Sequence, residues 1–443
     1  MPFLYVLPKQ GDVAPNTARL AELLCPYRGA IERHSLSTGQ LYLSAIAEAT
    51  PTGAAIPRGT RKNPQTAWLA IHADADGVRF ETDPLGTFPL WWIETDGFVA
   101  VTGEVKALRA LGVAIAFEPE RWPSDRKRPP DYSPYANVLR VRPGATLTIH
   151  RDGRRTETGA APLDYRPTAM LAAEAQAEAL EAALRASAKD IGGDVQPWGA
   201  FLSGGIDSST ATALLHRHDP GIRTYTLGTA HGDEYADAAA LATHLGTRHA
   251  QVFATTEQAL AHFERAVFCN ETIDGLSAET LAQLSVLAEV AARDVPRIVT
   301  GYGADLLFGS MLRHKLYMQV TGVDDLQSLI ERTMWSGEFA PFYAWAHGVE
   351  IHHLFWDPRV MNTAFQIPPE DSFDGTTEKL VLRGLTVASG LMQQAHAFRK
   401  KQALTDGTQF NRVLSAALGL TDRYAYDAKS DRAVAILRDV LTA

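Results

Sequence analysis

The chain has 443 residues, 46% of them hydrophobic and 21% charged, with a formal net charge of −9. This length and composition indicate a globular protein of two or three domains and exclude a disordered or fibrous chain. The acidic balance and the lack of a long basic stripe argue against nucleic acid as a partner, since the densest basic run, residues 121–128, precedes two prolines and is typical of a loop.

The first 160 residues predict short strands separated by Gly, Asp and Pro. Five runs have the apolar or β-branched character of strands. They are residues 41–47, 67–72, 77–81, 90–93 and 98–102. Their spacing favours stacked antiparallel sheets. Residues 153–162, with Gly at both ends of a polar run, have the composition of a linker.

Beyond residue 165 the pattern changes to an alternation of helices and strands. Helical patterns cover residues 169–191, 208–216 and 235–245. Strand-like runs cover residues 198–202, 222–227, 250–253 and 297–300. Strands that alternate with helices predict a parallel sheet with helices on both faces.

A phosphate-binding loop is the strongest signal, with Ser-Gly-Gly-Ile-Asp-Ser-Ser at residues 203–209 between a predicted strand and a predicted helix. Glycines allow close backbone approach to an oxyanion, and the free amides and dipole of a helix start favour phosphate. Asp207 stands where a carboxylate could hold Mg²⁺ against the phosphates. The loop lacks the lysine of the Gly-x-x-x-x-Gly-Lys-Ser/Thr motif and matches the Ser-Gly-Gly-x-Asp-Ser-Ser loop of ATP pyrophosphatases.

The chain resembles the asparagine synthetase B superfamily over nearly its whole length. Residues 83–92, 103–108 and 138–144 resemble three segments of that family's glutaminase domain. The resemblance implies an α+β Ntn-hydrolase-like sandwich at residues 1–160. An α/β ATP-pyrophosphatase synthetase domain, of the adenine nucleotide α-hydrolase type, is implied for residues 165–443.

The family's glutaminase nucleophile is a cysteine that becomes the N-terminal residue, whereas position 2 here is Pro2. Cys25 and Cys269 lie far along the chain and cannot supply an N-terminal thiol with its own α-amine as base. We therefore expect a glutaminase-like domain without glutamine hydrolysis.

The second ATP-site motif is Thr-Gly-Tyr-Gly-Ala-Asp-Leu-Leu-Phe-Gly at residues 300–309. The resemblance assigns Asp207 and Asp305 to Mg²⁺. Tyr302, and the absence of a Glu after Asp305, are similar to the β-lactam synthetases, including carbapenam synthetase. The nucleotide-binding residues implied are Ser203, Gly204, Gly205, Asp207, Ser208, Ser209, Leu227 and Gly301.

Two further residues match catalytic positions of the β-lactam synthetase branch. Glu338 opens a segment that ends in Phe-Trp-Asp at residues 355–357, and Lys401 lies in an Arg-Lys-Lys loop whose match is weaker at three positions. Each residue alone has an ordinary structural explanation. Together with Tyr302, in order and at the family's spacing, they favour catalysis. His352 and His353 have no third ligand at metal spacing and are expected to be structural.

The implied chemistry is activation of a carboxylate by ATP and attack of an amine on the resulting acyl-adenylate. Tyr302 with Glu338 would accept the amine proton, and Lys401 would stabilise the oxyanion. The preferred reaction is β-lactam closure within one small amino-acid substrate. A lasso-peptide cyclase acting on a precursor peptide, and an ammonia-dependent asparagine synthetase, are alternatives. A catalytically dead regulatory paralogue is disfavoured by the intact loop and Asp305.

The remaining expectations concern redox state and location. Two cysteines are too few for a disulfide framework or a cysteine zinc site. No stretch approaches the about 18 apolar residues of a membrane span, and the first residues lack the pattern of a signal peptide. We expect a cytoplasmic enzyme with ATP and Mg²⁺ as cofactors and without membrane partners; a homo-oligomer is compatible with the sequence.

Overall fold

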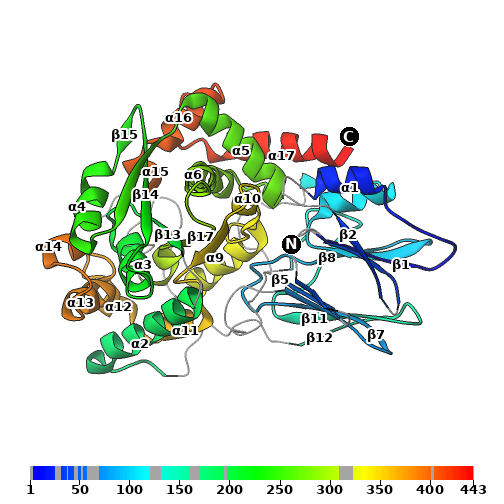
Figure 1. The fold of residues 1–443 in the computed structure, drawn as a ribbon, viewed down its shortest axis with the longest axis horizontal. Coiled ribbons are helices and arrows are strands. Elements are labelled where there is room, and N and C mark those ends of the chain that lie inside the picture. Colours follow the sequence, from blue (N-terminus) through cyan, green and yellow to red (C-terminus); the bar gives the residue numbers. More distant parts are fainter. Residues whose placement is uncertain are drawn as a thin grey trace.

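The computed structural model of the chain describes most of its length. The described residues are 3–24, 31–36, 38–43, 48–50, 53–56, 69–119, 131–159, 169–193, 197–308, 323–400 and 404–442. Figure 1 shows a β-rich N-terminal part beside a larger part in which helices surround a sheet.

Two antiparallel sheets build the N-terminal part, with strand orders β10-β8-β9-β1-β3-β2 and β12-β11-β7-β6-β5-β4. The strands of the first are β1 (Phe3–Pro8), β2 (Glu32–Ser35), β3 (Gln40–Leu43), β8 (Trp91–Glu94), β9 (Phe98–Thr102) and β10 (Leu139–Arg140). Those of the second are β4 (Glu48–Thr50), β5 (Gly53–Ile56), β6 (Leu69–Ala73), β7 (Gly77–Thr82), β11 (Ala145–His150) and β12 (Arg155–Gly159).

Side-chain alternation along β1 explains how this part packs. Phe3 and Tyr5 point into a core shared by both sheets, where Phe80 of β7 meets them. Leu4 and Val6 point to the opposite face and join the core beneath α1 (Thr17–Leu23) and the 3-10 helix η2 (Val105–Leu111). Both faces of β1 are therefore covered, because successive side chains of a strand point to opposite sides.

A parallel sheet forms the centre of the C-terminal part. Its strands are β13 (Trp198–Phe201), β14 (Arg223–Thr229), β16 (Arg248–Phe253), β17 (Arg297–Thr300) and β18 (Glu350–His353), and β15 (Gly232–Asp233) pairs antiparallel with the end of β14. The parallel pairs give the order β16-β14-β13-β17-β18. The chain order reverses between β13 and β17, which is where ligands bind in open α/β sheets.

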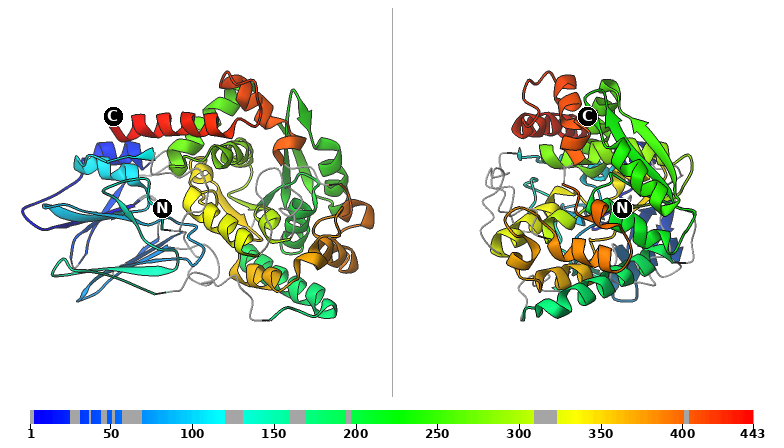
Figure 2. Two further views of the ribbon diagram at one scale, coloured as in Figure 1. Left: turned by 180° about the vertical axis from the view of Figure 1, so that it is seen from behind. Right: turned by 90° about the vertical axis from the view of Figure 1, so that its left-hand side faces the viewer.

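Helices surround this sheet (Figures 1 and 2). The longer ones are α2 (Ala173–Gly192), α3 (Ile206–His216), α4 (Tyr235–Leu245), α5 (Thr256–Asn270), α6 (Gly275–Ala291), α9 (Val323–Ser336), α11 (Pro358–Phe365), α13 (Leu380–Ala388), α16 (Phe410–Ala417) and α17 (Tyr426–Thr442). The four-residue ones are α7 (Ala304–Leu307), α10 (Phe342–Trp345), α12 (Pro369–Ser372), α14 (Gln394–Ala397) and α15 (Leu404–Gly407).

The two parts share a buried interface. Phe88, in the loop after β7, stacks on Trp345 with ring centroids 5.5 Å apart. Glu271, between α5 and α6, accepts the backbone N–H groups of Val105 and Lys106 at 2.8 and 2.7 Å and so caps η2. In Figure 2 helix α17, which belongs to the C-terminal part, extends toward α1 of the N-terminal part. Aromatic packing and capping thus hold the sandwich against the helices that carry the site.

Where the structure describes them, the strand and helix predictions in both parts are confirmed to within a few residues, with one correction. Residues 44–47 and 67–68, at the ends of two predicted strands, lie outside the described residues. The predicted linker is wrong over Arg155–Gly159, which forms β12 and pairs antiparallel with β11. The strand is polar and half exposed because it lies at the edge of its sheet, so it lacks the apolar pattern that identifies a strand. Among the described residues, no helix is long and apolar enough to cross a membrane.

Candidate functional site

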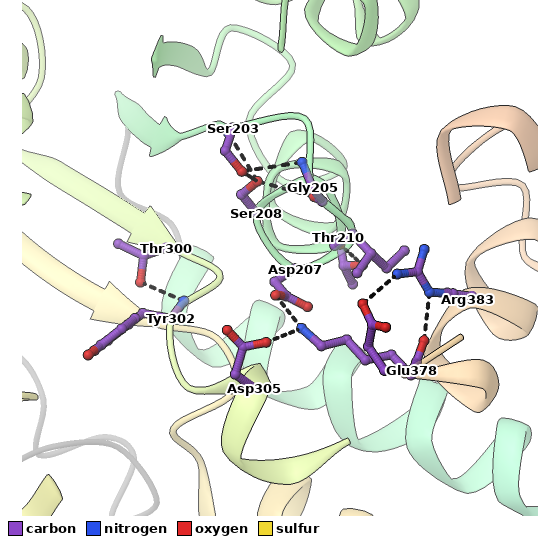
Figure 3. A network of polar contacts seen from close by, with 12 residues as sticks. Ser203, Gly205, Asp207, Ser208, Thr210, Thr300, Tyr302, Asp305, Glu378 and Arg383 are labelled. Carbon is purple, nitrogen blue, oxygen red and sulfur yellow. Dashed lines mark hydrogen bonds and ion pairs between the residues drawn. The ribbon is translucent and has the colours of Figure 1, made fainter. Parts of the chain in front are cut away.

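Two loops meet at the point where the chain order of the parallel sheet reverses (Figure 3). The loop of residues 202–205 joins β13 to α3, and the loop of residues 301–303 joins β17 to α7. Because β13 and β17 are adjacent parallel strands, both loops leave the same edge of the sheet. Secondary structure therefore brings together the two motifs that lie about a hundred residues apart in the sequence.

The phosphate loop is held in shape by its own serines. Ser203 Oγ lies 3.0 Å from Ser208 Oγ and accepts the N–H of Gly205 at 3.2 Å, while Ser208 Oγ accepts the N–H of Ser203 at 3.1 Å. Gly204 has φ +74°, and a Cβ there would meet the backbone of Asp237 at 2.7 Å. Ser209 is buried and continues the helix, donating its N–H to Gly205 O at 3.0 Å. The loop is thus folded around the start of α3, where backbone amides are available to an anion.

Gly301 packs directly against this loop. A Cβ at Gly301 would lie 2.3 Å from the carbonyl carbon of Asp207 and 2.4 Å from the backbone nitrogen of Ser208. No side chain fits at those distances, so glycine is required for the two loops to touch.

A buried lysine joins the two proposed metal-ligand carboxylates. Lys379 Nζ donates to Asp207 Oδ2 and lies 2.6 Å from Asp305 Oδ1. The Lys379 side chain is fully buried, whereas Asp207 is 16% and Asp305 42% exposed. Burial lowers the pKa of Lys379, and the Asp207 carboxylate opposes that effect.

Sequence reasoning missed Lys379 because it stands outside any recognised motif. It precedes α13 with φ 62°, a left-handed conformation uncommon for lysine. Held there, its ammonium group neutralises charge between two loops that come from distant parts of the chain.

A cavity of about 270 Å³ opens between the two loops and α6. The sequence-predicted residues that line it are Ser203, Gly205, Asp207, Ser208, Leu227, Gly301, Tyr302, Asp305 and Glu338. Its other wall is apolar and includes Leu276, Leu284 and Leu287, which lie on one face of α6. The cavity is thus lined by polar groups of the two loops and by apolar side chains of α6.

Tyr302 and Glu338 reach the cavity from different elements. The Tyr302 ring lies 4.9 Å from that of Phe339, the residue after Glu338, and 5.8 Å from His353. Phe339 stacks on Trp356 at 3.7 Å with an interplanar angle of 6°. Burial lowers the pKa of His353 to about 3, so this imidazole is neutral near pH 7.

Glu338 is buried, and its Oε2 atom contacts two side chains of the protein interior. Ser277 Oγ donates to Glu338 Oε2 at 3.0 Å, and Arg332 Nη1 lies 3.7 Å from the same oxygen. These two partners belong to α6 and α9, neither of which carries a recognised motif. They were not predicted, since a serine and an arginine inside helices carry no local signal.

Three residues of the sequence hypotheses, Pro2, Cys25 and Lys401, lie outside the described residues. The absence of glutamine hydrolysis and the role of Lys401 therefore stay predictions. Just before Lys401, Arg399 forms an ion pair with Asp237 and lies 3.7 Å from Glu234, a cavity residue. Arg399 therefore lies beside the cavity.

Asp207 and Asp305 are chemically suited to Mg²⁺, which is commonly held by one or two carboxylates together with substrate phosphates. Among the described residues, no cluster of three or more His, Cys, Asp or Glu side chains could hold a metal by itself. The two carboxylates thus fit a Mg²⁺ ion that arrives with a nucleotide.

Comparison with known proteins gives a consistent picture. The asparagine synthase family model matches residues 179–338 and 342–420. The carboxyethyl-arginine beta-lactam-synthase of Streptomyces clavuligerus is 29% identical over 292 residues, which cover 65% of this chain and 54% of that protein.

Two asparagine synthetases are also similar. A putative glutamine-hydrolyzing asparagine synthetase of Mycobacterium bovis is 31% identical over 57% of this chain and 40% of its own length. Asparagine synthetase B of Escherichia coli K12 is 25% identical over 48% of this chain and 42% of its own length. The chain spans about half the length of the curated relatives it matches. Since the family model covers more than half of the chain and its two loops form one cavity, this protein belongs to the asparagine synthase family.

Proposed function

We propose that this chain is an ATP-dependent carbon–nitrogen ligase that activates a carboxylate as its acyl-adenylate and releases AMP and pyrophosphate. The observation that carries the proposal is the single cavity that joins the loop of residues 203–209, the pair Asp207 and Asp305, and the buried Glu338. The loop and the two aspartates suit binding of a nucleoside triphosphate, and Glu338 suits proton transfer.

Each part of the cavity has a task in this reaction. The amides and hydroxyls of the phosphate loop bind phosphate oxygens, and Lys379 offers a buried positive charge beside them. Leu227, with Phe201 and Tyr225, supplies an apolar wall for the adenine base. Mg²⁺ bound with the nucleotide, through Asp207 and Asp305, would offset phosphate charge. The substrate carboxylate then displaces pyrophosphate at the α-phosphorus.

Formation of the amide needs a base. The attacking amine must lose a proton, and Glu338, buried at the cavity wall, is placed to take it. Tyr302 lines the same cavity and packs beside Phe339. We assign oxyanion stabilisation to Lys401 on the family resemblance.

As the specific amide-forming reaction of this ligase, we propose closure of a β-amino acid to a β-lactam. Support comes from the similarity to the Streptomyces carboxyethyl-arginine beta-lactam-synthase. Tyr302 adds support, since a tyrosine at this position resembles the β-lactam synthetase branch. An amine held near its own acyl carbon needs no second binding site, and effective molarities reach about 10⁵–10⁸ M. On this proposal, residues 1–160 are a glutaminase-like scaffold and residues 165–443 the synthetase domain.

Mass spectrometry of reactions with ATP, Mg²⁺ and candidate β-amino acids, precursor peptides, or aspartate with ammonia tests the proposal. A product one water lighter than its substrate, formed without added amine, supports ring closure. A peptide as its source would indicate the lasso-peptide cyclase, and incorporation of ammonia an asparagine synthetase. ADP and phosphate in place of AMP and pyrophosphate would refute adenylation.

Glu338→Gln separates the two half-reactions. Substrate-dependent exchange of pyrophosphate into ATP should survive, whereas amide formation should fall by about 10²–10⁴-fold, the usual contribution of a general base. Equal loss of both activities would place Glu338 in adenylation or folding.

A further inference from the structure

Behind Glu338, one serine hydroxyl lies between two carboxylates. Ser277 Oγ is 3.0 Å from Glu338 Oε2 and 2.9 Å from Asp274 Oδ1. Arg332 Nη2 donates to Asp274 Oδ1 at 2.5 Å, and Asp274 also caps α6 by accepting the N–H of Ser277 at 2.8 Å. All four side chains are buried. The cluster extends from the cavity wall, formed by Glu338 and Arg332, into the protein interior.

A hydroxyl has one proton and can donate to one of these carboxylates at a time. When Glu338 is ionised, Ser277 is directed to Glu338, because Asp274 Oδ1 already accepts from Arg332 and from the backbone. When Glu338 is protonated on Oε2, it donates to Ser277 Oγ, and Ser277 turns to donate to Asp274. The protonated state therefore contains one hydrogen bond more than the ionised state.

Charge favours the same state. Asp274 and Glu338 both contact Ser277 Oγ, so their like charges repel each other across it, and a proton on Glu338 removes that repulsion. Buried charge is costly, and neutralisation is favoured where water is excluded. On the neighbouring residue Phe339, the described titratable groups in ring contact are Tyr302 and His353, and burial keeps the His353 imidazole neutral.

We infer that Asp274, Ser277 and Glu338 act as one proton-accepting unit, in which reversal of the Ser277 hydroxyl stabilises the proton that Glu338 takes from the attacking amine. The N–H bond of the amine breaks with its electron pair kept by nitrogen, and an O–H bond forms on Glu338. Rotation of the carboxyl group about its Cγ–Cδ bond then directs this O–H to Ser277 Oγ. Ser277 and Asp274 are positioning residues that make Glu338 a stronger base than a carboxylate with a fixed donor. The inference rests on the proposed function.

The pH dependence of amide formation in Ser277→Ala tests this unit. The substitution removes three hydrogen bonds from the protonated state and two from the ionised state, because the bond from Arg332 Nη2 to Ser277 Oγ at 3.4 Å is lost in both. Glu338 therefore becomes a weaker base. The acidic limb of the rate profile should move to lower pH by about 0.4–1.1 units, the equivalent of one hydrogen bond. At pH values above this limb, the rate of amide formation should fall by less than the loss of about 10²–10⁴-fold that we expect for Glu338→Gln. Pyrophosphate exchange should be retained.

Ser285→Ala is the matched control. Ser285 is a fully buried serine on the same helix, bonded to His262 and His347, two turns away from Ser277. Its removal should leave the limb in place. Asp274→Asn is a second variant that keeps the cap, because Asn caps helices as well as Asp, and removes the charge. Its limb should also move to lower pH.

A limb that moves to higher pH in Ser277→Ala would show that Ser277 is only a fixed donor to ionised Glu338. A limb that does not move, in Ser277→Ala or in Asp274→Asn, would show a structural role. Either result, with exchange intact, overturns the inference and leaves the proposed function standing. Absence of substrate-dependent exchange in the wild-type protein would overturn both.

Discussion

Replacement of Lys379 by methionine removes the ammonium group that separates Asp207 from Asp305. Both carboxylates contact one nitrogen atom, so without it their oxygens would face each other at no more than about 5 Å and repel by at least about 3 kcal/mol at an effective dielectric constant of 20. Asp305 is 42% exposed, and solvent screening reduces this figure. We expect the free energy of unfolding to fall by about 1–3 kcal/mol.

A divalent cation should reverse this loss. With the ammonium group gone, Mg²⁺ can bind between the two carboxylates, and ligand that binds only the native state raises its stability. Thermal melts with and without Mg²⁺ should show a larger rise of the melting temperature in Lys379→Met than in the wild type. Pyrophosphate exchange should be lost or strongly reduced, because the positive charge beside the phosphates is missing.

Lys429→Met is the control for loss of a buried lysine. Lys429 is also fully buried and pairs with Glu279, away from Asp207 and Asp305. That variant should lose stability, gain nothing extra from Mg²⁺ and keep exchange. Equal Mg²⁺ shifts in the two variants, or full exchange activity in Lys379→Met, would refute the assignment of Lys379 to the phosphate end of the cavity.

Three further predictions concern the site and the core. Asp207→Asn or Asp305→Asn should abolish Mg²⁺-dependent pyrophosphate exchange while circular dichroism shows an intact fold; normal exchange would remove these residues from metal binding. Gly301→Ala should disrupt nucleotide binding, measured by calorimetry, because its Cβ would lie 2.3 Å from Asp207, whereas Gly384→Ala, with open space around it, should be neutral. Burial lowers the pKa of His347 to about 4 from 6.5, so the unfolded chain binds more protons between these values and stability falls as pH drops from 6.5 to 4. His347→Gln should flatten that part of a denaturation-versus-pH curve, and an unchanged slope would exclude this histidine as a source of acid sensitivity.

The sequence alone determined the features that depend on local chemistry. The residues before Ser203 and Gly301 are short apolar runs, and the structure has them as β13 and β17. Once both runs are parallel neighbours, the two loops must meet, because carboxyl ends of parallel strands share an edge. The predicted cavity residues that follow β13 and β17, Ser203 to Ser208 and Gly301 to Asp305, follow from that argument.

Local composition failed where a polar segment is ordered by its neighbours. Arg155–Gly159 has the composition of a linker, yet it forms a strand because β11 offers its backbone hydrogen bonds. Pairing with a neighbouring strand, and not side-chain pattern, decides such an edge strand.

Only the tertiary structure decided how charges and protons are arranged around the site. Lys379 has no motif, and its contacts with Asp207 and Asp305 exist because α13 begins beside both loops. Ser277 and Arg332 meet Glu338 because α6 and α9 pack at the cavity wall. The distance between two side chains on different helices depends on the packing of those helices, and no periodicity within either helix encodes it.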